Sequence, residues 1–338
     1  MLAPMTNRQS NQDGTLTSTE IDWLVSRAQG GFGFVTTAAA FVSRAGKAWH
    51  GQLGISADSH VRGLARLAAG LRGAGAVSAV QLNHGGLQGN PIASGEQLIA
   101  PWRDTATGAQ ELTTDQIYGV INDFASAAVR AERAGFDGVQ VQAGHAYLLC
   151  QFLEPDRNRR TDGYGGDYSG RTHIISDIIE AIRARTGTDF QVGVRLSPER
   201  MGIDPAEMRR LAGDLMAAGK IDYVDLSMWN VRKQPDATGQ PRLLIDSYAS
   251  LERHSTKLGV GGSVSGSADG QWCLEHNADF VAIGTAAILD REFAAKALTD
   301  PTYLAPRLPV TGDYLRIQGI SETFGELLNE GMPQFLDD

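Results

Sequence analysis

Short apolar runs alternate with longer segments of helical periodicity along the whole chain. The runs are rich in β-branched residues and have the length of buried strands, whereas apolar residues recur every three or four positions in the longer segments. We predict eight strands, at residues 2–5, 31–39, 78–84, 137–143, 191–196, 223–229, 258–264 and 280–286. We predict helices between them, at residues 18–29, 61–75, 113–135, 171–187, 204–219 and 270–277.

The helix over residues 113–135 has well-marked ends. Thr113 or Thr114 can cap its first amides, and Gly135 stands where a left-handed carboxyl-terminal cap is wanted.

Strands that are apolar on both faces, each followed by a helix, indicate a parallel sheet covered by helices. Eight such units would close into a (β/α)8 TIM barrel of about 250 residues plus insertions, which fits the 338 residues here. The alternative is an open doubly wound sheet, but no Gly-x-Gly-x-x-Gly follows the first strand. We therefore predict a single TIM-barrel domain over residues 1–338, with an excursion at 90–111 after the third strand and a tail at 300–338.

The charge and cysteine content argue against several classes of function. The formal net charge of −9 and the lack of a basic patch argue against a nucleic-acid partner. We interpret the short basic run at 157–160 as a loop that pairs charges within the chain or contacts a partner subunit in a homo-oligomer, and the alternative is a solvated turn. Cys150 and Cys273 have no zinc-like spacing, so we expect no metal site. Without a signal-like start or an apolar stretch of about 18 residues, we expect no membrane contact and a cytoplasmic location.

In a TIM barrel, chemistry lies at the carboxyl ends of the strands. The last two predicted strands end at Gly262 and Ser263 and at Gly284 and Thr285, where backbone N–H groups can hold a phosphate. Arg195 ends an otherwise apolar strand and needs a partner, either the N1 and O2 edge of a flavin or a salt bridge inside the barrel.

Gln142, His145 and Tyr147 cluster around the end of another strand. An amide and an imidazole can donate hydrogen bonds to a carbonyl oxygen, and a phenol can deliver a proton to carbon. Gln81 offers a further amide to the edge of a ring, although a glutamine in a barrel core is as often structural.

The chain resembles the old yellow enzyme family of FMN-dependent ene-reductases, the NADH:flavin oxidoreductases. The resemblance runs through "LAPMTN", "VQLNHGG", "VGVRLSPE", "ADFVAIGTAAILD" and, most specifically, "GFDGVQVQAGHAYLLCQFLEPDRNRRTDGYGGDYSGR". It implies a TIM barrel that holds FMN noncovalently. The residues implied at the flavin and its phosphate are Ala3, Pro4, Met5, Thr6, Ala39, Gln81, Arg195, Gly262, Ser263, Gly284 and Thr285.

The resemblance also implies a ping-pong reaction. NADPH or NADH would reduce FMN, and the flavin would then reduce the activated C=C bond of an α,β-unsaturated carbonyl compound. Tyr147 would be the proton donor, Gln142 and His145 would bind the carbonyl oxygen, and Thr6 would tune the flavin near its C4 carbonyl.

Two positions depart from the family pattern. The carbonyl-binding pair is His with His or Asn in the family, whereas Gln142 is a neutral amide that cannot become cationic. Thr285 stands where the family commonly has Arg, which we expect to weaken FMN binding by about 1.5 to 3 kcal/mol. Two alternatives therefore stay open: an FMN-binding barrel with little ene-reductase activity, and a flavin-free barrel lyase acting on a phosphorylated substrate.

Overall fold

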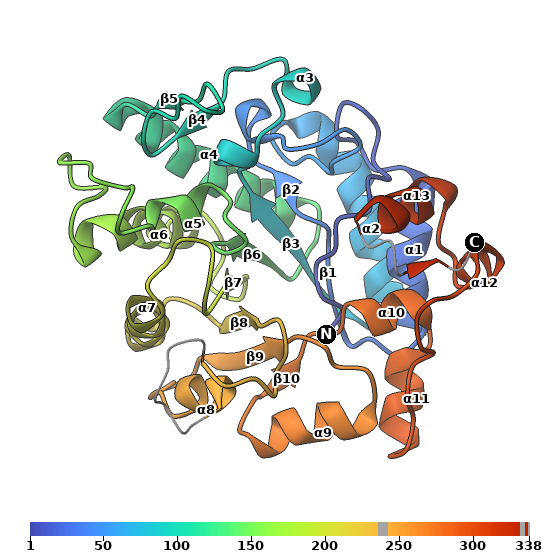
Figure 1. Ribbon diagram of the computed structural model, residues 1–338. Coiled ribbons are helices and arrows are strands. Elements are labelled where there is room, and N and C mark those ends of the chain that lie inside the picture. Colours follow the sequence, from blue (N-terminus) through green and yellow to red (C-terminus); the bar gives the residue numbers. More distant parts are fainter. Residues whose placement is uncertain (236–242, 332–334, 337–338) are drawn as a thin grey trace.

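The computed structural model describes residues 1–235, 243–331 and 335–336 (Figure 1). Among these residues, eight parallel strands form one sheet in the order β1-β3-β6-β7-β8-β9-β10, with β2 paired beside β3. Their bounds are Phe34–Thr36 for β1, Ala40–Phe41 for β2, Val77–Asn83 for β3, Gly138–Gln142 for β6, Gln191–Leu196 for β7, Tyr223–Ser227 for β8, Lys257–Gly261 for β9 and Phe280–Val281 for β10.

The sheet closes through Leu2. This residue forms parallel bridges to both Val35 and Ile283, so it lies between the first and the last strand. Its N–H donates to the Phe34 carbonyl at 2.7 Å. The predicted strand at 2–5 shrinks to this bridge because Pro4 has no N–H to continue the ladder. The prediction of a (β/α)8 barrel is confirmed.

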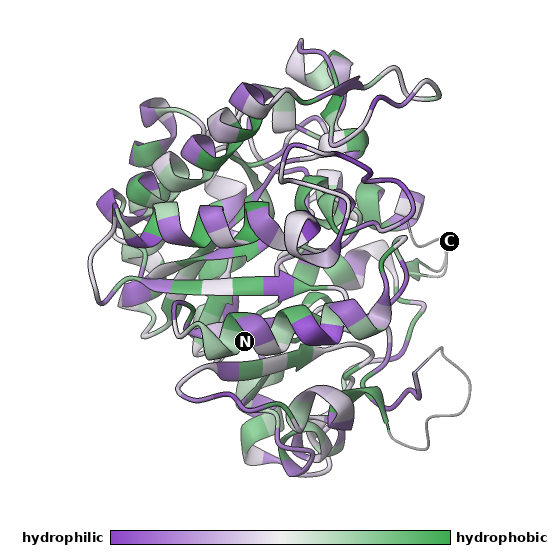
Figure 2. Cartoon of the chain, turned by 90° about the vertical axis from the view of Figure 1, so that its left-hand side faces the viewer, coloured by the Kyte–Doolittle hydropathy of each residue, from purple (hydrophilic) through white to green (hydrophobic). Residues whose placement is uncertain are grey.

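Helices surround the sheet and turn their apolar faces inward, so that they are banded in hydrophobic and hydrophilic colours in Figure 2. The longer ones are α1 Ser18–Gln29, α2 Val61–Gly73, α4 Thr114–Arg133, α6 Tyr168–Arg183, α7 Pro205–Ala217, α9 Ser267–Glu275 and α13 Glu322–Gly331. The shorter ones are η1 Arg44–Gly46, η2 Asp58–His60, η3 Gly86–Gln88, α3 Pro91–Ser94, α5 Leu148–Phe152, α8 Leu244–Ala249, α10 Thr285–Leu289, α11 Phe293–Thr299 and α12 Gly312–Ile317. Each predicted helix overlaps an observed one.

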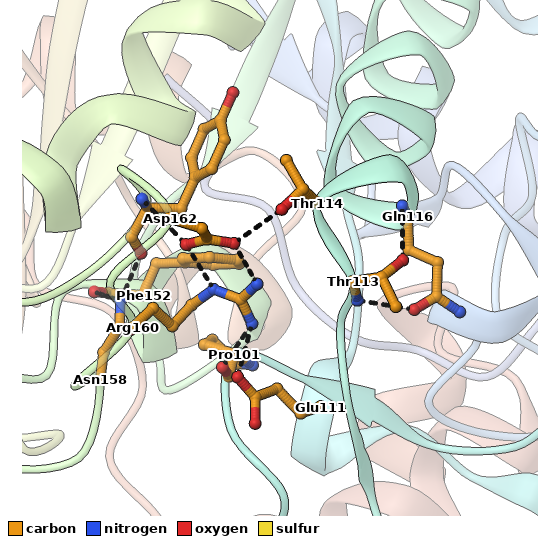
Figure 3. A network of polar contacts seen from close by, with 10 residues as sticks. Pro101, Glu111, Thr113, Thr114, Gln116, Phe152, Asn158, Arg160 and Asp162 are labelled. Atoms are coloured by element: carbon orange, nitrogen blue, oxygen red, sulfur yellow. Dashed lines mark hydrogen bonds and ion pairs between the residues drawn. The ribbon is translucent and has the colours of Figure 1, made fainter.

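The two ends of α4 follow the sequence prediction. The Thr113 hydroxyl accepts from the Gln116 N–H at 3.2 Å, and the Gln116 side chain accepts from the Thr113 N–H at 2.8 Å, which is a capping box (Figure 3). Gly135 has φ +87°, a left-handed conformation that favours glycine just beyond a helix.

The excursion at 90–111 contains α3 and a small parallel pair, β4 Ile99–Ala100 and β5 Gln110–Glu111. Arg160, which is 9% exposed, holds this excursion against the barrel. Its guanidinium donates to the Pro101 carbonyl at 2.9 Å and to Asp162 at 3.1 Å, and Asp162 also accepts from Thr114 (Figure 3). The basic run at 157–160 therefore pairs charges within the chain. Contact with a partner subunit stays a prediction.

The predicted tail packs on the first helix, and α13 lies beside α1 (Figure 1). Phe324 is 1% exposed and packs edge-to-face on Trp23, with 5.4 Å between ring centroids. Ser321 donates to the Gln9 side chain at 2.6 Å. The tail thus braces the chain just beyond residues 3–6. Its residues 332–334 and 337–338 lie outside the described residues.

We predict that Phe324→Ala lowers the free energy of unfolding by about 3 to 5 kcal/mol, because it removes a large buried ring and leaves a cavity. Thr323→Ala, an exposed neighbour on the same helix, is the matched control and should change it by less than about 0.5 kcal/mol. Urea unfolding followed by circular dichroism measures both. Similar losses in the two variants would show that Phe324 does not anchor the tail.

Candidate active site

A cavity of about 300 Å³ opens where the carboxyl ends of β7, β8, β9 and β10 meet the amino-terminal segment. It is lined by Ala3, Pro4, Met5, Arg195, Ser227, Met228, Trp229, Gly261, Gly262, Ser263, Val264, Ala282, Gly284 and Thr285. The structure therefore brings together most of the residues that the sequence assigned to the cofactor. Thr6 follows this segment and is half-buried, and Ala39 is buried.

Gln81 points into the barrel interior. It is 2% exposed, and its amide nitrogen donates to the Gln140 side chain at 2.7 Å. Gln140 in turn donates to Asp225 at 3.2 Å. Gln81 is therefore the first member of a buried polar chain.

The glycine-rich end of β9 has a backbone that tolerates little else. Gly262 has φ +152°, and a Cβ there would lie 2.1 Å from the Met228 carbonyl oxygen. By contrast, a Cβ on Gly284 would meet only Met5 Sδ, at 3.6 Å. Ser263 and Thr285 beside them are exposed. The Ser263 hydroxyl donates to the Trp229 carbonyl at 2.8 Å, whereas no such bond engages the Thr285 hydroxyl among the described residues. The exposed Thr285 hydroxyl and the open backbone at Gly284 suit a phosphate group.

Arg195 pairs with an acid inside the barrel. Its Nε lies 3.5 Å from Asp225 Oδ2, and its Nη2 donates to Ser227 Oγ at 3.1 Å. Asp225 is fully buried and Arg195 is 7% exposed. The salt bridge that the sequence left open is therefore present. Arg195 Nε and Nη1 are still buried without a hydrogen-bond partner among the described residues, so the contact with Asp225 is an ion pair only.

His145 forms a hydrogen-bonded unit with Gln142 and Ser227. The Gln142 amide nitrogen lies 2.9 Å from Nδ1, and Nε2 lies 2.8 Å from Ser227 Oγ. Since an amide NH₂ faces Nδ1, Nδ1 accepts and the ring proton resides on Nε2. Burial, and then the charge of Arg195, lower the pKa of His145 to about 3, so the ring is neutral at pH 7.

The backbone that carries His145 is strained. His145 and Ala146 have φ +57° and +55°, which non-glycine residues rarely adopt. Such residues cost about 1 to 3 kcal/mol each and cluster at functional sites. The His145 N–H donates to Ser197 Oγ at 2.9 Å, which helps to hold this turn.

Tyr147 directly precedes α5 and is partly buried. Burial raises the pKa of its phenol to about 12, so the hydroxyl keeps its proton at neutral pH. The Trp49 ring lies beside it, with 6.4 Å between ring centroids. A protonated phenol next to an aromatic wall can act as a general acid.

Sequence reasoning missed several residues of this site, namely Gln140, Asp225, Ser227 and Trp49. Asp225 carried a usable signal, because it is the one acid within the apolar run at 223–229. Ser227 carried none, since a hydroxyl in a strand end is common. Gln140 and Trp49 could be found only from the three-dimensional contacts.

The site fits a planar group with a phosphate tail. The partnerless Nη1 of Arg195 requires an acceptor, and Gly262 and Gly284 line the same cavity. Among the described residues, no three His, Cys, Asp or Glu side chains gather as a metal-binding group. No helix within the described part of the chain is long and apolar enough to cross a bilayer.

Comparison with known proteins agrees with this geometry. The model of the NADH:flavin oxidoreductase / NADH oxidase family matches residues 1–300, and the chain belongs to this family. The resemblance to old yellow enzyme is thereby confirmed, and the chain belongs to a family of FMN-dependent NAD(P)H oxidoreductases.

Individual relatives are similar over most of this chain. A probable NADH-dependent flavin oxidoreductase of Bacillus subtilis, YqiG, is 31% identical over 307 residues, which are 87% of this chain and 82% of that protein. The NADH:acrylate oxidoreductase of Vibrio harveyi is 33% identical over 320 residues, 89% of this chain, but this chain spans only 32% of its length. An old yellow enzyme homologue from Zymomonas mobilis has a TM-score of 0.81 at 25% identity, covering 95% of this chain and 94% of that one.

We predict that His145 stays neutral, with its proton on Nε2, down to pH 5. A free histidine titrates near 6.5, whereas burial and Arg195 lower the pKa of this ring to about 3. Nitrogen-15 NMR of the side chains, assigned with His145→Asn, measures the protonation state. A His145 signal that titrates between pH 6 and 7 would contradict the arrangement.

We predict that Gly262→Ala weakens FMN binding at least tenfold, because its Cβ forces the backbone away from Met228. The control is Gly270→Ala in α9, where an added Cβ meets nothing within 4 Å. Titration of the flavin-free protein with FMN, followed by visible absorbance, gives both affinities. Wild-type affinity in Gly262→Ala would remove this loop from the phosphate site.

Proposed function

We propose that the protein is an ene-reductase that uses NADPH or NADH to reduce the activated C=C bond of small α,β-unsaturated carbonyl compounds. The reaction consumes one NAD(P)H, one proton and one alkene, and yields NAD(P)⁺ and the saturated compound. Bound FMN would accept the two electrons from the nicotinamide and pass them to the alkene in a second half-reaction. The observation that carries this proposal is His145, which lies within hydrogen-bond distance of Gln142 and of Ser227, a residue that lines the cavity.

For the cofactor, we assign the flavin ring to Ala3, Pro4, Met5, Thr6, Ala39, Gln81 and Arg195, and the phosphate to Gly262, Ser263, Gly284 and Thr285. The unpaired Nη1 of Arg195 supports this assignment, because negative charge gathers at the N1 and O2 edge of a flavin on reduction. Thr285 supplies a hydroxyl and no charge at the phosphate. The weaker FMN binding expected from it stays a prediction.

For the substrate, we assign the carbonyl oxygen to Gln142 and His145. The Nε2–H of His145 is the available donor, and its bond to Ser227 would have to open for a carbonyl to bind. Both groups are neutral at pH 7, so they would polarise the carbonyl through dipoles only.

We assign Tyr147 as the residue that donates a proton to the α-carbon of the substrate. Its raised pKa supports this role, since the group that must deliver a proton holds one throughout the neutral range. A cytoplasmic location and substrates of the enone type belong to the same proposal.

A second candidate is an FMN barrel that takes electrons from NAD(P)H but reduces alkenes poorly. Gln142 favours it, because an amide cannot donate from a cationic form. The two half-reactions distinguish the candidates. Bleaching of FMN by NADPH followed by rapid recolouring with cyclohexenone supports the ene-reductase, and recolouring by oxygen alone supports the second candidate.

We predict that Tyr147→Phe slows reoxidation of the reduced flavin by cyclohexenone about 100-fold, because it removes the acid that protonates the product. Flavin reduction by NADPH should be nearly unchanged, since no proton is delivered to carbon in that step. Tyr118→Phe, on the exposed face of α4, is the control and should affect neither step. Stopped-flow absorbance resolves both rates, and an equal loss in both steps would refute the role of Tyr147.

A further inference from the structure

A network of polar side chains crosses the barrel interior and reaches the proposed cofactor site through Arg195. It runs from Gln81 on β3 to Gln140 on β6, to Asp225 on β8 and to Arg195 on β7. Gln81 is 2% exposed, Gln140 and Asp225 are fully buried, and Arg195 is 7% exposed. These groups come from four adjacent strands, so the barrel holds them in fixed positions.

Among these four side chains, Asp225 is the only anion and Arg195 is the only cation. An ionised carboxylate without solvent contact is costly unless it is paired, and only one neutral donor, Gln140, supplements the guanidinium. Asp225 Oδ1 has no hydrogen-bond partner among the described residues. Arg195 is the guanidinium that lies against this charge. The buried amino group of Met1 also interacts with Asp225, but burial lowers the pKa of that amino group to about 6, so it is largely uncharged at pH 7.

We propose that Asp225 is a positioning residue that acts through Arg195 and lowers the midpoint potential of the bound flavin. This inference rests on the proposed contact between Arg195 and the flavin. Reduction places negative charge at the ring, and a bare guanidinium would stabilise that charge strongly. The negative charge of Asp225 reduces this stabilisation of the reduced flavin, because charges in a buried site interact with little screening.

Gln140 moderates the same carboxylate. Its amide nitrogen donates to Asp225 Oδ2, while its oxygen accepts from Gln81. Gln140 thus spreads the carboxylate charge and fixes the amide of Gln81 at the same time. An apolar replacement, which cannot donate a hydrogen bond, would leave the Asp225 charge concentrated on Arg195.

The test measures the midpoint potential of FMN in the FMN-loaded protein by dye equilibration. In Asp225→Asn we expect the affinity for reduced FMN relative to oxidised FMN to rise at least tenfold, a shift of about 30 mV to more positive potential for a two-electron couple. Asp222→Asn is the matched control. It makes the same charge change just before β8, where Asp222 pairs with Arg183 at 2.7 Å, and should shift the ratio less than threefold.

Gln140→Leu provides an independent arm that changes no charge, and it decides the question if Asp225→Asn does not fold. We expect it to shift the potential in the opposite direction, because the carboxylate loses its neutral donor. A wild-type potential in folded Asp225→Asn overturns the inference. So does an unchanged potential in Gln140→Leu, or an equal shift in Asp222→Asn, which would mean that net charge alone matters.

These outcomes differ from failure of the proposed function. If the wild-type protein binds FMN but cannot reduce an enone, only the ene-reductase proposal fails, and the potentials still decide the role of Asp225. If the protein takes up no FMN, both proposals fall.

Discussion

The site depends on closure of the parallel sheet by Leu2. One residue forms parallel bridges to both Val35 and Ile283, and this joins the first strand to the last. In a closed parallel barrel all strands end on the same face. Residues from position 3 to position 285 can therefore share one cavity. Without this closure, the segment Ala3 to Met5 would have no reason to lie against the end of β10.

Closure also creates an interior in which charge is expensive. The fully buried Asp225 and the nearly buried Arg195 are tolerable because they pair with each other, and because Gln140 and Ser227 satisfy part of their remaining hydrogen-bonding capacity. What remains unsatisfied is informative. Arg195 Nη1 has no partner among the described residues, and it belongs to a residue that lines the cavity. The barrel thus carries an incompletely satisfied polar network, and the unpaired donor belongs to a residue that lines the candidate site.

The sequence was sufficient for the alternation of strands and helices, for the capping box at Thr113 and for the glycine beyond α4, since these depend on local periodicity and cap chemistry. It also indicated which residues end the strands, and the structure gathers most of them. It could not show which way those side chains turn. Gln81 faces Gln140 and Arg195 faces Asp225 because neighbouring strands are in register, and register is a property of pairing between distant segments. The Leu2 bridge was equally hidden, since the run at 2–5 looks like any short strand.

The neutral character of Gln142 has an electrostatic reason in this fold. Arg195 already contributes to lowering the pKa of His145 to about 3, so a second ionisable imidazole at position 142 would meet the same desolvation and the same cation. An amide avoids that conflict and fixes the His145 tautomer through Nδ1. Tyr147, with its pKa near 12, is the complementary group that holds its proton. Between the pKa of His145 and the pKa of Tyr147, neither side chain changes its protonation state. The hydrogen bonds that His145 and Tyr147 can donate therefore depend on the positions of these side chains and not on pH.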